Sequence, residues 1–189
     1  MIEIKAATTS DIENILVILN TEIGKDFYHR EQLFSLLNSN ENSFCLIALY
    51  HSELVGLSIS TIFNSDFPFA HTGIRKQQLP ISYRDKKRRF GYIKTIAVSK
   101  AFQRKGVGSL LCAKSIKALT EKQINAIIVT AWQQREVVYS EKMLLSQGLK
   151  HIGSIPKFWK KESITKKYNC CICGNPPCLC TAILFGTLL

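Results

Sequence analysis

Two glycines and two basic residues stand together in the stretch FQRKGVGSLL, residues 102–111. An apolar run precedes the stretch and a helical pattern follows it, so we expect a strand that enters a helix through a short turn. The first N–H groups of a helix lack acceptors and attract an anion. Gly106 and Gly108 lack the Cβ atoms that would keep a phosphate away from this backbone. The stretch is therefore a candidate phosphate cradle, and a tight turn with close helix–sheet packing is the alternative.

A second group of residues suited to chemistry is the stretch YNCCICGNPPCLC, which holds five of the seven cysteines. Four of them form a C-x2-C-x4-C-x-C arrangement, which suits a tetrahedral structural zinc ion. They are Cys170, Cys173, Cys178 and Cys180, and Cys171 is either a spare thiol or a substitute for Cys170. A reduced cluster without metal, an iron–sulfur site and disulfides remain open as alternatives. The run TAILF that follows is expected as an edge strand.

The bulk composition is that of a globular chain with an excess of positive charge. Its 189 residues suffice for one domain with a buried core, and its formal net charge is +11. This charge attracts anions, whether nucleic acid, an acidic protein, a membrane surface or a phosphorylated cofactor. The N-terminus lacks a signal-peptide pattern, and no segment has the roughly 20 apolar residues of a membrane span. We therefore expect a cytoplasmic protein without a membrane partner.

The elements that must position these groups alternate between strand-like and helix-like patterns. An antiparallel hairpin is predicted in the first third of the chain, and a strand–helix–strand unit surrounds the glycine stretch. Strands are predicted over residues 2–8, 43–50, 54–63, 91–98, 125–132 and 149–155, and helices over residues 11–20, 29–38, 106–121 and 135–147.

Residues 64–90 form a long basic excursion between two of these strands. A loop of this length inside a compact domain is usually functional or mobile. Its run RDKKRRF predicts either a clamp for an acidic ligand, such as a peptide, tRNA or acidic metabolite, or a solvated run of charge.

With YIKTIAV before it, the run Gln103-Arg104-Lys105-Gly106-Val107-Gly108 resembles the Q/R-x-x-G-x-G/A element of the GNAT superfamily of N-acetyltransferases. The resemblance covers roughly residues 1–156, because the order of elements matches as well. It implies a GNAT fold of the α/β (α+β) class: a central mixed, mostly antiparallel sheet flanked by helices. A V-shaped cofactor cleft is then expected between the strands at 91–98 and 125–132. We expect an acetyltransferase domain over residues 1–160 and a tail with the cysteine cluster over 161–189.

The resemblance also implies the donor and its contacts. Acetyl-CoA lies in the V-shaped cleft, and an amine attacks its thioester directly in a ternary complex. The pyrophosphate accepts hydrogen bonds from backbone N–H groups of the glycine stretch, while the pantetheine arm pairs with the strand before it. The backbone N–H of Val98 polarises the thioester carbonyl. The implied cofactor-binding residues are Ile96, Ala97, Val98, Gln103, Arg104, Lys105, Gly106, Val107, Gly108 and Ser109.

The acid and base residues common in this family are missing from their usual positions. Lys94 stands where many relatives carry a carboxylate, and Leu144 stands where many carry a tyrosine that protonates the thiolate. Tyr139 and Tyr92 are the candidate catalytic substitutes, and each is equally interpretable as a packed aromatic. We place Tyr139 on the fourth helix, about 140° around the axis from Leu144.

These departures leave a second function open, namely a CoA-binding or RNA- or protein-binding module with weak or no catalysis. For the enzyme, the acceptor is an unidentified amine, and the basic segment is compatible with an acidic one. Nucleic acid is not favoured as a partner, and the sequence does not choose between a monomer and a homodimer.

Overall fold

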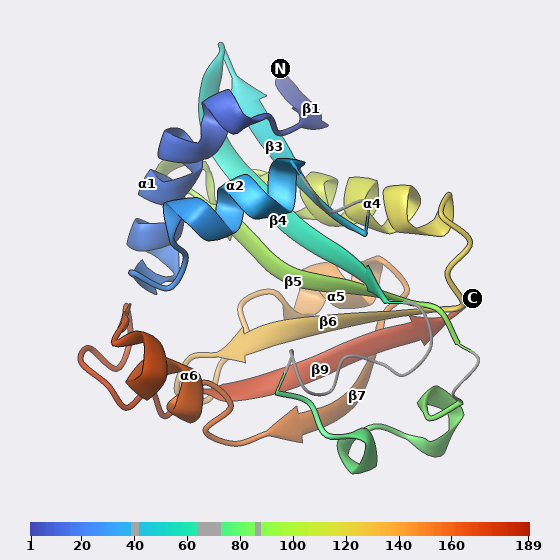
Figure 1. Ribbon diagram of the computed structural model, residues 1–189. Coiled ribbons are helices and arrows are strands. Elements are labelled where there is room, and N and C mark those ends of the chain that lie inside the picture. Colours follow the sequence, from blue (N-terminus) through green and yellow to red (C-terminus); the bar gives the residue numbers. More distant parts are fainter. Residues whose placement is uncertain (39–41, 64–72, 86–87) are drawn as a thin grey trace.

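A seven-stranded sheet runs through the computed structural model, which describes residues 1–38, 42–63, 73–85 and 88–189 (Figure 1). All neighbouring strands are antiparallel except β5 and β6, which are parallel. The mixed, mostly antiparallel sheet predicted from the sequence is therefore confirmed. In spatial order its strands are β1 (Ile2–Ala6), β3 (Ser43–Tyr50), β4 (Glu53–Phe63), β5 (Phe90–Val98), β6 (Ala126–Gln133), β9 (Thr181–Leu188) and β7 (Lys150–Ile155).

Helices cover both faces of this sheet. Figure 1 shows α1 and α2 on one side of the sheet and α4 and α5 on the other, with α6 beyond the ends of β6 and β9. The buried hydroxyls of Ser58 on β4 and Ser115 on α4 share a 2.7 Å hydrogen bond that ties α4 to the sheet. The helices are α1 (Ile12–Glu22), α2 (Arg30–Asn38), α4 (Val107–Thr120), α5 (Glu141–Ser146) and α6 (Lys160–Lys166), and the short 3-10 turns are η1 (Thr9–Asp11), η2 (Lys76–Gln78), η3 (Ile81–Tyr83) and η4 (Lys100–Phe102).

Strand β9 lies in the interior of the sheet, so the edge strand expected for TAILF is wrong. It pairs with β6 along one side and with β7 along the other. Ala182, Leu184 and Phe185 are each 0% exposed, and they belong to cores on opposite faces of the sheet. Pairing along both edges and burial on both faces therefore place β9 inside the sheet. The domain boundary at residue 160 stays a prediction, but β9 shares the sheet with the strands before it.

The described part of the basic excursion packs against the sheet. Ile74, Leu79 and Tyr83 are buried in a core cluster with side chains from β5, β6 and β9. The guanidinium groups of Arg84 and Arg88 donate to backbone carbonyls of the segment itself. Figure 1 shows this segment in green beside β9. Residues 64–72 and 86–87 of the excursion lie outside the described residues.

No helix among the described residues is long and apolar enough to cross a membrane.

We expect Phe185→Ala to lower the free energy of unfolding by about 3–5 kcal/mol, because a fully buried aromatic ring leaves a cavity between β9 and α5. Leu188→Ala on the same strand is the control, since Leu188 is 40% exposed. Urea denaturation of both variants measures the difference. Equal small losses would contradict the interior position of β9.

Candidate functional site

A V-shaped opening in the sheet begins where β5 and β6 part. The two strands pair from Phe90 to Ile93 on β5 and from Ala126 to Val129 on β6, and both then continue without pairing to each other. The pairing of β5 with β4 shifts register at the same place, which leaves Lys94 as an extra residue on β5. Such a bulge bends a strand and increases its twist. The cleft predicted between these two strands is therefore present.

A cavity of about 1010 Å³ occupies this opening. Residues 94–98 of β5 and 129–132 of β6 line its two sides. It reaches the start of α4 at one end, which we call the cradle end. At the other end it is bounded by Phe27, Phe158, Trp159 and α6, and we call this the acceptor end. One continuous cavity thus connects the glycine stretch with the cysteine-rich segment.

The cradle end is formed by the turn between η4 and α4. Gly106 is the N-cap of α4, with φ +83° in the left-handed region that glycine adopts without strain. The first bond of the helix runs from the N–H of Leu110 to the carbonyl of Gly106, at 3.0 Å. The N–H groups of residues 107–109 therefore have no acceptor within the helix. A Cβ built on Gly106 meets no atom within 4 Å, so the space above it is open.

Most of the predicted cofactor-binding residues line the cavity, and two do not. Lys105 lies outside, with its Nζ 5.3 Å from the ring centroid of Phe102. The side chain of Val107 is 2% exposed and packs in the core beneath α4. The residues that line the cavity are Ile96, Ala97, Val98, Gln103, Arg104, Gly106, Gly108 and Ser109.

Gln103 also has a structural partner that the sequence did not indicate. Its amide Nε2 donates to the carboxylate of Glu22 and to the carbonyl of Val98, each at 2.9 Å. The second oxygen of Glu22 accepts the backbone N–H of Lys100 at 3.1 Å. The end of α1 is thereby fixed to the turn that forms the cradle.

The two candidate tyrosines lie in different surroundings. Helix α5 begins at Glu141, so Tyr139 stands in the turn before it and the predicted helical angle from Leu144 does not apply. Residues 134–137 form a β-bridge instead of a first helical turn. Tyr139 lines the cavity and is 67% exposed. Leu144, at the position where relatives carry tyrosine, is buried but also lines the cavity.

Tyr92 spans the point where the strands part. Its hydroxyl lies 2.6 Å from that of Thr130, the first residue of β6 beyond the paired stretch. Burial raises the pKa of Tyr92 well above its usual range, although the bond to Thr130 acts in the opposite direction. This phenol is therefore protonated at neutral pH and is fixed to the neighbouring strand.

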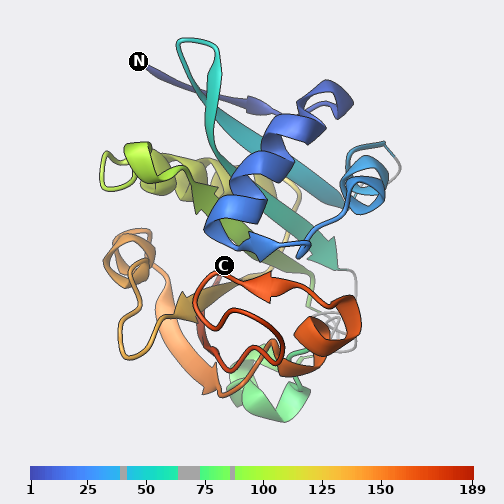
Figure 2. The same ribbon diagram turned by 90° about the vertical axis from the view of Figure 1, so that its left-hand side faces the viewer.

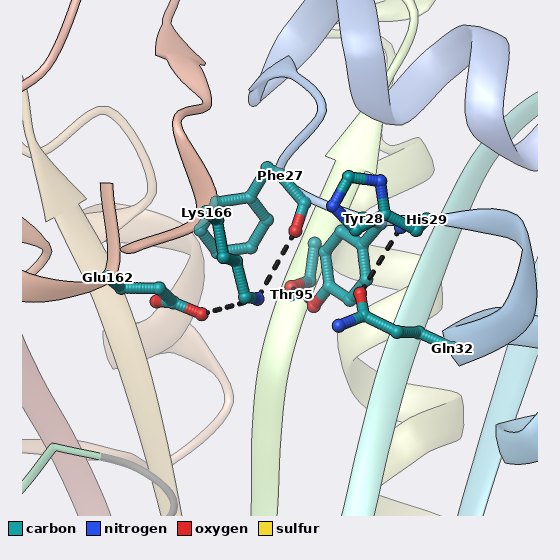
Figure 3. A network of polar contacts seen from close by, with 7 residues as sticks. All are labelled: Phe27, Tyr28, His29, Gln32, Thr95, Glu162 and Lys166. Atoms are coloured by element: carbon teal, nitrogen blue, oxygen red, sulfur yellow. Dashed lines mark hydrogen bonds and ion pairs between the residues drawn. The ribbon is translucent and has the colours of Figure 1, made fainter. Parts of the chain in front are cut away.

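Helix α6 and the segment between α1 and α2 meet at the acceptor end (Figure 3). Lys166 donates to Glu162 at 2.7 Å and to the carbonyl of Phe27 at 3.4 Å. Beside them, the buried hydroxyl of Tyr28 lies 2.7 Å from that of Thr95 on β5. Neither Glu162 nor Lys166 was identified from the sequence. Their i,i+4 spacing in KKESITK was the available signal, but nothing local shows that this helix borders the cleft.

Lys94 projects from the bulge toward aromatic rings. Its Nζ lies 5.7 Å from the ring centroid of Phe27 and 5.2 Å from that of Tyr28. Lys161 and Lys166 line the same end of the cavity, as does the carboxylate of Glu162. Positive charge therefore exceeds negative charge among the described residues of the acceptor end.

The four predicted metal ligands come together beside this end. The sulfur atoms of Cys170, Cys173, Cys178 and Cys180 all lie within 4.8 Å of one another. Cys171 is outside the group, and its thiol lies 3.3 Å from the carbonyl oxygen of Glu22. The hydrogen bond from Cys178 and those from two backbone N–H groups lower the pKa of Cys170 to about 5, against the effect of burial.

A parallel pair that splits beside a glycine-containing helix start is the architecture of the GNAT fold. The Acetyltransferase (GNAT) family model matches residues 10–143, which is more than half of the chain. The chain belongs to the acetyltransferase (GNAT) family and is an acetyl-CoA-dependent acyltransferase.

Solved structures share this fold at low sequence identity. A GNAT-family acetyltransferase from Streptococcus pneumoniae superposes with TM-score 0.66 at 17% identity, with 100% of both chains covered. Arabidopsis thaliana NAA60 in complex with acetyl-CoA superposes with TM-score 0.69 at 15% identity, with 100% of this chain and 99% of that chain covered. The ribosomal-protein-S18-alanine N-acetyltransferase from Escherichia coli superposes with TM-score 0.63 at 13% identity. The match covers 100% of this chain and 94% of that chain. No match was found among curated proteins.

We expect Gly106→Val to weaken acetyl-CoA binding about 10- to 100-fold, because a side chain over the turn blocks hydrogen bonds to an anionic group. Gly148→Val is the matched control. Gly148 has φ +78°, a built Cβ there also meets open space, and it does not line the cavity. Both variants carry similar backbone strain of about 1–2 kcal/mol. Calorimetric titration with acetyl-CoA measures the affinity of each variant. Equal affinities of Gly106→Val and Gly148→Val would exclude the cradle.

Proposed function

We propose that this chain is an N-acetyltransferase that passes the acetyl group of acetyl-CoA directly to an amine in a ternary complex. The observation that supports it most is the continuous cavity from the cradle end to the acceptor end. A donor bound at the first end and an acceptor bound at the second can meet beside the unpaired part of β5. No covalent enzyme intermediate is then needed.

The donor is held by the backbone of β5 and of the turn before α4. Phosphates bind the N–H groups at residues 107–109 and the positive end of α4. Arg104 and Lys100, which line this part of the cavity, add charge. The pantetheine arm lies along residues 96–98, where the cleft side of β5 has no strand partner among the described residues. The N–H of Val98 donates to the oxyanion that forms at the thioester carbon.

The chemical step exchanges one bond to the acetyl carbon for another. A neutral amine attacks the thioester carbon, the C–N bond forms, and the C–S bond of the tetrahedral intermediate breaks. The nitrogen loses a proton to water, the CoA thiolate gains one from the protein, and water returns a proton to that donor, so the proton balance is zero. We assign the donation to Tyr139, which lines the cavity just before α5 begins. Tyr92 positions the two strands through its bond to Thr130.

The acceptor is an amine that also carries an anionic group. Lys94, Lys161 and Lys166 line the acceptor end, and Glu162 neutralises only part of their charge because it is already paired with Lys166. A cation against aromatic rings binds a carboxylate or phosphate with little competing hydration. In the described part of the basic excursion, Gly73 lines the cavity. The guanidinium groups of Arg84, Arg88 and Arg89 donate to backbone carbonyls. The acceptor end is closed by the cysteine cluster, for which we keep the prediction of a structural zinc ion.

The alternative is a CoA-binding module without efficient chemistry. It is favoured by Lys94 and Leu144 at the positions where relatives carry acid and base groups. Binding of acetyl-CoA without acetylation of any amine acceptor would support it over the enzyme.

Tyr139→Phe should lower kcat about 100-fold, because the thiolate then leaves without a positioned proton donor. The affinity for acetyl-CoA should stay the same, since the cradle end is untouched. Tyr50→Phe is the control, because Tyr50 is partly exposed and does not line the cavity. Steady-state kinetics with product detection by mass spectrometry give kcat and the KM for acetyl-CoA. An unchanged kcat would remove Tyr139 from the reaction.

Acceptor choice tests the proposed function as a whole. Amines offered in matched carboxylate and amide forms should be acetylated in the carboxylate form, with the mass of an acetyl group added. Lys94→Met should raise KM for that form about 10- to 100-fold, because a charged hydrogen bond is lost while the alkyl packing is kept. KM for acetyl-CoA should not change. Equal use of charged and neutral amines by the unaltered enzyme would contradict an anionic acceptor.

A further inference from the structure

The four sulfur atoms of the cysteine cluster have the spacing of a metal tetrahedron. Sγ of Cys180 lies 3.9 Å from Sγ of Cys170 and 3.4 Å from Sγ of Cys173. Zinc–sulfur bonds of about 2.3 Å place tetrahedral thiolates about 3.8 Å apart. A disulfide needs about 2.05 Å, so these sulfurs are too far apart to be bonded pairs. An iron–sulfur cluster would need wider separations, because its own atoms lie between the thiolates.

Backbone groups around the cluster are oriented to stabilise thiolates. The N–H groups of Ile172 and Cys173 point at the sulfur of Cys170, at 3.5 and 3.4 Å. The N–H of Leu179 points at the sulfur of Cys173 at 3.4 Å. Such N–H···S contacts stabilise the negative charge of a thiolate, and a neutral thiol has no such charge. The turn of the C-x2-C half is closed by reciprocal backbone bonds between Cys170 and Gly174.

A buried indole also faces the cluster without an ordinary partner. The Nε1 of Trp132 on β6 is buried and has no hydrogen-bond partner of good geometry among the described residues, although it lies close to Cys180. Three of the four sulfurs belong to residues less than 10% exposed. Four adjacent thiolates, three of them in buried residues, require a cation, and no lysine or arginine contact to these sulfurs is present among the described residues.

The cluster lies between two segments that form the acceptor end. In Figure 2 the cysteine-rich segment lies directly below α1. The short strand β8 (Asn169–Cys170) pairs with β2 (Gly24–Lys25), which follows α1. On its other side, the N–H of Cys178 donates to Ser163 of α6 at 2.8 Å. Cys170, Cys178 and Cys180 belong to the same core cluster as Phe27 and Tyr28.

The geometry points to a zinc ion bound by Cys170, Cys173, Cys178 and Cys180, which holds α6 and the α1–α2 segment together as the wall of the acceptor end. The metal is structural, because four thiolates fill the tetrahedral shell. The site itself is independent of the reaction, while its effect on the acceptor rests on the proposed function. Zinc loss releases the wall and leaves the cradle end, built from β5 and α4, in place.

Metal analysis of the purified full-length protein tests the site. We expect about one zinc ion per chain. Cys173→Ser should lose it, and Cys171→Ser should keep it, because Cys171 lies outside the sulfur group. Cys173 is exposed, so its replacement creates no core cavity. Retention of zinc by Cys173→Ser, iron in place of zinc, or a disulfide found by mass spectrometry under non-reducing conditions would overturn the site.

Thiol labelling supplies a readout that does not depend on activity. In the zinc-loaded protein, Cys171 should react before the four ligands, because its sulfur is outside the metal group, while Cys45 and Cys112 are buried in the core. A chelator should expose all four ligands together, as peptide mass spectrometry would show. Rapid labelling of Cys173 before chelation would contradict a bound metal.

Kinetics with and without zinc test the wall. Chelation, or Cys173→Ser, should raise KM for the amine at least about tenfold and leave the affinity for acetyl-CoA unchanged. An unchanged acceptor KM in zinc-free protein would overturn the wall but not the site. If no amine is acetylated even by the zinc-loaded protein, the proposed function fails, and metal analysis still decides the site.

Discussion

The structure depends on the parting of β5 and β6 after Ile93 and Val129. Two parallel strands normally share hydrogen bonds along their whole overlap, yet here the bulge at Lys94 turns β5 away. The open edge exposes backbone groups to a ligand, and the hydroxyl pair of Tyr92 and Thr130 fixes the point where the opening starts. Every group discussed for donor binding lies along this edge or at the helix that follows it. A continuous ladder would leave no space for a thioester.

The second constraint is the position of β9 between β6 and β7. Because β9 must return to the middle of the sheet, the chain between β7 and β9 crosses the open end of the V. This crossing carries α6 and the cysteine cluster to the side of α1. Part of the segment predicted as a tail, residues 161–189, therefore forms a wall of the cavity. The pairing of β8 with β2 makes the contact specific in register.

The charges of the cavity follow from these two constraints. The start of α4 supplies unpaired N–H groups at one end, where a phosphate fits. At the other end, the bulge directs Lys94 toward Phe27, and α6 brings Lys161 and Lys166. Arg84, Arg88 and Arg89 of the excursion, by contrast, donate to carbonyls of the main chain. Net charge in the sequence thus did not locate the lysines at the acceptor end of the cavity.

The sequence by itself determined the local elements: the strand that ends at Val98, the glycine turn, helix α4 and the C-x2-C-x4-C-x-C spacing. Hydrophobic period, glycine positions and cysteine spacing are short-range signals, and they act within one or two turns of chain. Only the tertiary structure decided that Tyr139 precedes α5, that β9 is interior, and that Lys166, which is paired with Glu162, contacts Phe27. Lys166 and Phe27, for example, lie more than 100 positions apart in the sequence and still contact each other. Such contacts are set by which buried faces pack together, and no local pattern records that choice.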